Sequence, residues 1–193
     1  MKKAIRYILL TVCVCVFCYS AYNLINIYLN YKKIDDDYGE LAKTYTEEKE
    51  EKESYLQINW DELLQRNKDV KAWIQIPNTN VNYPVLQGET NDTYIHSDID
   101  HNELSAGSIF IASENEDPFN DFNTVIYGHN MKNGSMFNNI KSYTDQSFAD
   151  EHPYVYIYLP DGTVSQYKVV VFQNQVFYIV HKLLIRLHLY KKW

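Results

Sequence analysis

The sequence predicts a mostly β domain, a small barrel or sandwich with short helices, preceded by an N-terminal membrane-spanning helix. Three observations lead to this prediction. Short runs of alternating apolar and polar residues, bounded by turn residues, recur from Ala72 onwards. The 193-residue chain contains 18 tyrosines, and tyrosine suits half-buried strands. An almost unbroken apolar stretch lies close to the N-terminus.

Residues 1–30 are predicted to form a membrane anchor. Basic residues precede an apolar stretch that begins at Ile8, and the span from Tyr7 to Ile27 meets the roughly 20 helical residues that a bilayer requires. The alternative is a cleavable signal peptide, but the stretch has no convincing small-residue cleavage site. Because the basic residues come first, we expect a single-pass protein of the cell membrane, with a cytoplasmic N-terminus and an extracellular domain.

The three cysteines, Cys13, Cys15 and Cys18, all lie in this apolar stretch. A metal or redox cluster is one interpretation of their spacing. No histidine or carboxylate is nearby to complete such a site, and buried cysteine commonly behaves as a small hydrophobic residue. We therefore expect no metal site and no cofactor.

Residues 31–56 are highly charged and include "EEKEEKE", which predicts a solvated helical stalk, with an acidic functional segment as the alternative. The net charge of -7 argues against nucleic acid as a partner. A domain is predicted over residues 57–172, and it begins with a short amphipathic helix at Ile58–Asn67.

Strands are expected at "AWIQI", at "VNYPVLQ", which is interrupted by Pro84, and at "SIFIA" and "TVIYG". Short helices are expected at Ser135–Ile140 and Gln146–Glu151. The runs "YVYIYL" and "VSQYKVVVF" flank a turn at Pro160–Thr163 and predict a hairpin.

The stretch "NTVIYGHNMKNGSMF" places His129 directly after a strand and a glycine. A histidine in this position suits proton transfer near neutral pH, although a plain loop-capping histidine shows the same local pattern. No role is assigned to His96, His101 or His152. Ser135 and Thr124 are not favoured as nucleophiles because nothing in the sequence singles out either residue.

From about Trp60 to Phe172 the chain resembles the class B sortases of Gram-positive bacteria. The resemblance is carried by "DVKAWIQIPNTNVNYPVLQG", "AGSIFIASEN" and, most specifically, "NTVIYGHNMKNGSMF". One departure is visible, since many relatives have an aspartate and an arginine in the stretch where this chain has Ala112 and Glu114. The resemblance implies a sortase-type β-barrel.

The resemblance also implies a membrane-anchored cysteine transpeptidase. Such an enzyme cleaves an Asn-Pro-x-Thr type signal near the C-terminus of a secreted protein through a thioester. It then transfers the acyl group to an amine of a cell-wall precursor or of another protein. The family histidine, a general acid/base, falls on His129. The resemblance further implies a cysteine at the end of a Thr-Leu-x-Thr-Cys strand and an arginine on the next strand.

Neither partner residue is found where the resemblance requires it. No cysteine follows Cys18, and residues 173–193 form an aberrant basic and apolar tail without acidic residues. We interpret the chain as a C-terminally truncated or frameshifted class B sortase with an incomplete barrel, in which Arg186 is not the family arginine. The alternative for the tail is a membrane-binding amphipathic helix.

Whether this chain is an enzyme is therefore uncertain, and we expect it to be inactive as written. One alternative is a non-catalytic, membrane-anchored module that binds sorting signals without cutting them. The other is a membrane-anchored structural protein without a role in sorting.

Overall fold

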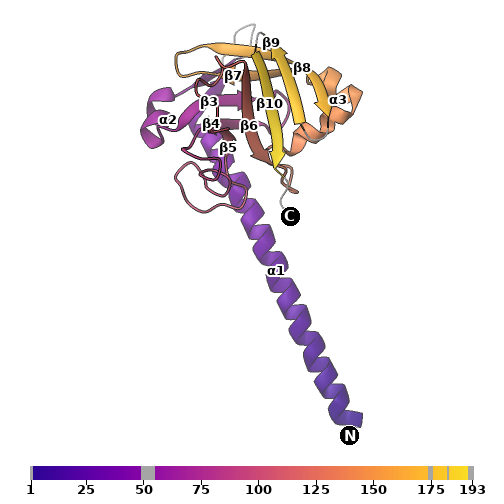
Figure 1. Cartoon of the computed structure of the whole chain (residues 1–193). Coiled ribbons are helices and arrows are strands. Elements are labelled where there is room, and N and C mark those ends of the chain that lie inside the picture. The colour runs from indigo at the N-terminus through magenta and orange to yellow at the C-terminus, as the bar shows by residue number, and fades with distance from the viewer. Residues whose placement is uncertain (1, 49–54, 174–175, 182, 191–193) are drawn as a thin grey trace. The chain divides into compact units, whose positions relative to one another are not determined.

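The computed structural model describes residues 2–48, 55–173, 176–181 and 183–190. The chain divides into two compact units, Met1–Asp36 and Asp37–Trp193. The first unit is a segment of helix α1 (Lys2–Tyr45), and the second holds the C-terminal end of that helix and the β domain (Figure 1).

Helix α1 is long and apolar enough, by length and composition, to cross a membrane. Large apolar side chains such as Tyr7 and Phe17 are exposed along its first unit, which is compatible with a membrane anchor. In the second unit the helix differs from the predicted solvated stalk. Tyr38, Leu41 and Tyr45 are buried because their spacing of three and four residues places them on one helical face.

The segment expected to be a helical stalk, residues 31–56, is helical only as far as Tyr45. Strand β1 (Thr46–Glu48) follows directly and pairs antiparallel with β2 (Leu56–Ile58). Helix α2 (Trp60–Arg66) lies within the predicted range, and the Asn59 side chain caps it by accepting a hydrogen bond from the Glu62 backbone N–H. The amphipathic helix predicted at this point is therefore confirmed.

The remaining elements follow the predicted order. They are β3 (Val70–Gln75), β4 (Asn82–Leu86), β5 (Ile109–Ile111), β6 (Asn123–His129), the 3-10 helix η1 (Asn138–Thr144), α3 (Gln146–Glu151), β7 (Tyr154–Tyr158), β8 (Val164–Gln173), β9 (Val176–His181) and β10 (Leu183–Tyr190).

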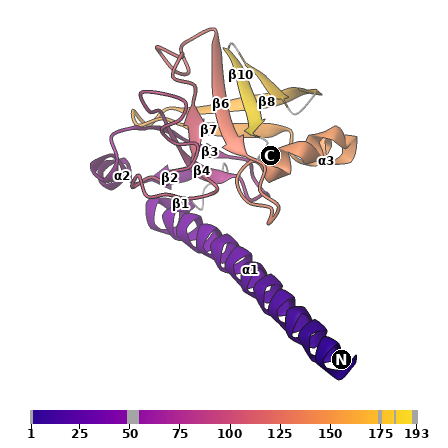
Figure 2. The same cartoon turned by 60° about the horizontal axis from the view of Figure 1, so that its bottom comes forward.

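Eight strands form one closed mixed sheet in the order β10-β6-β5-β4-β3-β7-β8-β9, so the predicted mostly β barrel with short helices is confirmed (Figure 1). The predicted hairpin is present as β7 and β8, which pair antiparallel from Tyr154↔Lys168 to Tyr158↔Val164. Strands β6 and β10 run side by side in the same direction, as Figure 2 shows.

The tail differs from its prediction. We expected residues 173–193 to be an aberrant tail that leaves the barrel incomplete, yet β9 and β10 form an antiparallel pair that joins β8 to β6 and closes the sheet. The helical alternative is not adopted either. In β10 aliphatic residues alternate with polar or aromatic ones from Ile185 to Tyr190, and this period of two suits a strand.

Pro84 does not interrupt β4. It is paired with Trp73 of β3 on one side, whereas β5 pairs with β4 only at Val85 and Leu86. Proline lacks a backbone N–H, and it is tolerated where no neighbouring strand requires that donor. The core of the domain is apolar, and Trp73, Ile74 and Phe137 are fully buried within it.

Candidate active site

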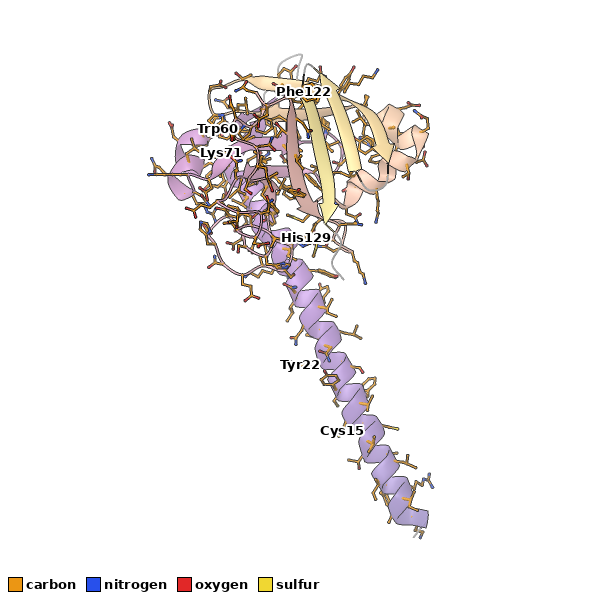
Figure 3. All side chains as sticks on the ribbon, in the orientation of Figure 1. Cys15, Tyr22, Trp60, Lys71, Phe122 and His129 are labelled. Atoms are coloured by element: carbon orange, nitrogen blue, oxygen red, sulfur yellow. The ribbon has the colours of Figure 1, made fainter. Side chains whose placement is uncertain are left out.

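His129 is the last residue of β6 and is only 2% exposed. Strand β6 is held on both sides, because Ile126 and Tyr127 pair with β5 and the whole strand pairs with β10. Figure 3 shows His129 at one end of this strand and Phe122, just before it, at the other. The histidine therefore lies at a rim of the barrel on a rigid strand, as its sequence position predicted.

Gly128 allows the strand to pass close to the loop that follows it. A Cβ atom at this position would lie 2.5 Å from Cδ1 of Ile109 and 2.5 Å from Cδ2 of Phe137, and both of those side chains are fully buried. The Phe137 backbone N–H donates to the His129 carbonyl oxygen at 2.9 Å. The glycine and this hydrogen bond together fix the backbone of His129.

The loop after His129 is fixed by hydrogen bonds to its backbone. The Met136 N–H donates to the Tyr83 hydroxyl oxygen at 3.0 Å, and Met136 has a φ of 55°. The Asn138 side-chain amide donates to the Met131 carbonyl oxygen at 2.7 Å. Because Tyr83 belongs to β4, the first bond ties the loop to the sheet, and the second holds the loop to the start of η1.

A second histidine, His96, lies at the site. Its ring centroid is 5.6 Å from that of His129, with an angle of 32° between the ring planes. His96 is exposed and comes from the segment between β4 and β5. The sequence analysis gave it no role, because a contact between residues 33 positions apart leaves no local pattern.

Four other residues considered in the sequence analysis have partners elsewhere than His129. Thr124 is near the opposite end of β6, and its hydroxyl oxygen accepts a hydrogen bond from the Phe119 N–H at 2.9 Å. The Ser135 hydroxyl donates to the Asn133 side-chain oxygen at 2.8 Å. The His101 ring stacks on Tyr94 with centroids 5.3 Å apart, and the His152 ring lies against Phe148 with centroids 4.3 Å apart.

The backbone of Arg186 is opposite Val125 in the parallel pairing of β10 with β6, whereas Tyr190 is opposite His129. Four residues of strand separate Arg186 from that register position, a distance of ~13 Å. That Arg186 does not take the place of the family arginine stays a prediction.

Two ionisable groups elsewhere in the domain have pKa values displaced for clear reasons. Burial raises the pKa of the Tyr38 phenol, whose hydroxyl donates to the Gly107 carbonyl oxygen at 2.6 Å. A two-pronged hydrogen bond from Arg66, at 2.8 and 2.6 Å, lowers the pKa of the Asp100 carboxyl group. In the part of the chain that the structure describes, no group of three or more His, Cys, Asp or Glu residues is arranged to hold a metal ion.

Residues 74–180, more than half of the chain, match the sortase domain family model. The chain belongs to the sortase family. Its curated relatives and structural neighbours include class B sortases, so the resemblance seen in the sequence is confirmed.

Two curated relatives define the extent of the similarity. Sortase B of Listeria monocytogenes is 40% identical over 58% of this chain and 44% of its own length. Sortase B of Staphylococcus aureus is 30% identical over 89% of this chain and 69% of its own length. The matched region thus spans less than half of the first sortase and about two thirds of the second.

A solved structure of sortase B from Bacillus anthracis has a TM-score of 0.64 and 26% sequence identity to this chain. The match covers 76% of this chain and 72% of that sortase. The sortase fold that the sequence predicted, with an N-terminal apolar helix and short helices beside a curled mixed sheet, is thereby confirmed.

Proposed function

We propose that this chain forms a class B sortase-type site for an Asn-Pro-x-Thr sorting signal of secreted proteins, with His129 as its general acid/base. The observation that carries the proposal is the position of His129. It is buried at the rim of a closed sheet inside a sortase domain. Since the sortase family acts on sorting signals, the substrate is a peptide segment.

The chemistry of transpeptidation assigns a definite task to His129. Attack on the signal's amide carbonyl requires a thiolate, the departing amine requires a proton, and the tetrahedral oxyanion requires a hydrogen-bond donor. A strand-end imidazole supplies the proton. The acceptor in the complete reaction is an amine of a cell-wall precursor or of another protein.

The sequence of this domain supplies no thiol to attack the amide carbonyl of the signal. The chain's three cysteines lie in the apolar helix α1, and the residues after Cys18 include none. The proposal also leaves the family arginine without a counterpart, because Arg186 is not taken as that residue. We therefore expect no peptide cleavage by this chain alone, and activity requires that both groups be supplied.

A second function, a non-catalytic module that binds sorting signals, is favoured by one observation. Strands β9 and β10 close the sheet beside β6, so the strand that carries His129 has a neighbour on each side. A closed sheet can hold a peptide at its rim without carrying out chemistry on it. In either function the N-terminal helix anchors the domain to the cell membrane, with the domain outside.

The two functions are separated by experiments on the full chain in detergent micelles. A fluorogenic Asn-Pro-x-Thr peptide should remain uncleaved above background. A second chain, in which the residues after Phe172 are replaced by the C-terminal third of a class B relative, should cleave it. His129→Ala in that second chain should reduce the rate by about 100-fold or more.

Cleavage by the unmodified chain would contradict the proposal that it lacks a nucleophilic thiol. A lack of activity in the chain with the replaced C-terminal third would contradict the sortase role of His129. Fluorescence anisotropy of a labelled Asn-Pro-x-Thr peptide tests the binding module. Saturable binding to the unmodified chain, absent for a peptide of scrambled order, would support it.

A further inference from the structure

We propose that His96 is a positioning residue for the reaction proposed above, because its imidazole packs against that of His129 and restricts the orientation of that ring. The inference rests on the acid/base role proposed for His129. It adds to the site a residue from the segment between β4 and β5.

The contact has the geometry of an aromatic pair. The two ring centroids are 5.6 Å apart, within the range of roughly 4.5–7 Å at which aromatic rings interact. His129 is buried whereas His96 is exposed, so His96 lies on the solvent side of the pair.

The backbone at His96 and directly after it is fixed by hydrogen bonds. The Leu104 N–H donates to the His96 carbonyl oxygen at 2.9 Å, and the Ser108 hydroxyl donates to the Ser97 carbonyl oxygen at 2.8 Å. Ser97 also forms an isolated antiparallel bridge with Glu103. An exposed side chain on a loop is usually mobile. The backbone that carries the His96 side chain is instead held by these hydrogen bonds.

This support continues into the core. Tyr94, two residues before His96, is fully buried, and its carbonyl oxygen accepts a hydrogen bond from the Ser108 N–H at 2.9 Å. Gly107 has a φ of 55°, and a Cβ there would lie 2.3 Å from the Ile95 carbonyl oxygen. The segment that carries His96 therefore packs backbone to backbone against the start of β5.

Orientation matters for the proposed chemistry. A general acid acts only when its ring nitrogen points at the leaving atom, and small misplacements are costly in rate. The contacts described above fix the backbone of His129, whereas the orientation of its ring depends on rotation about the side-chain bonds and on the groups packed against the ring. A neighbouring ring on a fixed backbone limits that rotation, which is the task we assign to His96.

The test uses the full chain in detergent micelles with isotope-labelled histidine, whose 6 residues give separable ring signals in NMR spectra. We expect a nuclear Overhauser effect between the ring protons of His96 and His129. His96→Ala should shift and broaden the ring signals of His129. His96→Phe, which keeps a ring and cannot titrate, should retain narrow His129 signals.

Glu103→Ala is the matched control, because this exposed residue bridges Ser97 through its backbone alone. It should leave the His129 signals unchanged. The His152 ring, which lies against Phe148, reports whether each variant is folded, and His96→Gln replaces His96→Ala if the alanine variant is not.

Two results would overturn the inference: no Overhauser effect between the rings, or His129 signals that stay unchanged in the folded alanine or glutamine variant. The measurement needs no turnover. If the chain with the replaced C-terminal third stays inactive while the two rings show the Overhauser effect, the proposed function is contradicted and the ring contact stands, so the two failures are distinguishable.

Discussion

At the residue scale, the site depends on close packing behind His129. Gly128 has no side chain, and Ile109 and Phe137 fill the space where one would project. Both neighbours are fully buried, so neither can swing away from an added methyl group. The sequence places a glycine before the histidine, but only the packing shows why that glycine is needed.

Gly128→Ala should destabilise the domain by about 1–3 kcal/mol, the usual cost of an overpacked core. Urea denaturation followed by tryptophan fluorescence measures the free energy of unfolding. Gly39→Ala is the matched control, because nothing lies within 4 Å of the added Cβ and the residue is helical. This control should be neutral or slightly stabilising. Equal stability of Gly128→Ala and the wild-type chain would contradict the packing argument.

A second residue-scale prediction concerns the ion pair between Arg66 and Asp100, which joins α2 to the turn beyond His96. Because Arg66 lowers the folded pKa of Asp100 below its ordinary value of 3.8, the pair stabilises the fold at higher pH. This contribution is present above that ordinary value and is lost as pH falls through the lowered folded pKa.

Asp100→Asn should therefore cost about 0.5–1 kcal/mol at neutral pH, a small figure because both partners are more than a third exposed. Below the folded pKa the variant and the wild-type chain should unfold with equal free energy. Urea titrations at neutral and strongly acidic pH measure both values. A difference that persisted at acidic pH would show that Asp100 acts through something other than its charge.

At the element scale, β10 determines whether the sheet is closed. It pairs with β6 on one side and with β9 on the other, and Leu187 is opposite both Ile126 and Phe177. An unpaired β6 would expose a row of backbone donors and acceptors next to His129. The strand that the sequence analysis did not expect therefore supports the element that carries the candidate site.

Leu187→Pro should open this pairing, because proline removes a backbone donor and a buried partner left without its bond costs about 1–3 kcal/mol. Hydrogen exchange of the backbone amides in Thr124–Gly128 should accelerate in this variant. Leu187→Ala keeps the backbone donor and is the matched control. If the amides of β6 exchanged at the same rate in the proline and alanine variants, the pairing of β10 with β6 would be contradicted.

At the scale of the whole molecule, the chain combines an apolar helical unit with a sortase domain. The tyrosines of the second unit contribute to the domain in two ways. Some fill the core, and others reach polar partners through their hydroxyl groups. Tyr158 does both, because its hydroxyl donates to the Gln75 side-chain oxygen at 2.7 Å and its burial raises its pKa to about 12.

The proposed orientation predicts the result of a proteolysis experiment. Protease added to intact protoplasts should degrade the domain, because basic residues before an apolar span favour a cytoplasmic N-terminus and so predict an extracellular domain. A tag placed before Lys2 should survive until the membrane is permeabilised. A domain that stays intact in intact protoplasts would contradict this orientation.

Local patterns in the sequence determined the apolar N-terminal helix, the strands β3 to β6, the β7–β8 hairpin and the position of His129 at a strand end. These features depend on period, turn residues and short motifs, which are written within a few neighbouring residues. The same patterns were enough to reveal the family, because the stretch from Asn123 to Phe137 is unusually specific.

The tertiary structure alone decided three matters. It buried Tyr38 of the expected stalk, paired the tail strand β10 with β6, and placed His96 against His129. Each of these contacts joins residues more than 30 positions apart, so no local period encodes it. Such contacts form when the sheet closes and the segments between strands pack over its rim. Burial and backbone pairing then determine which residues meet, and the propensity of any one segment does not.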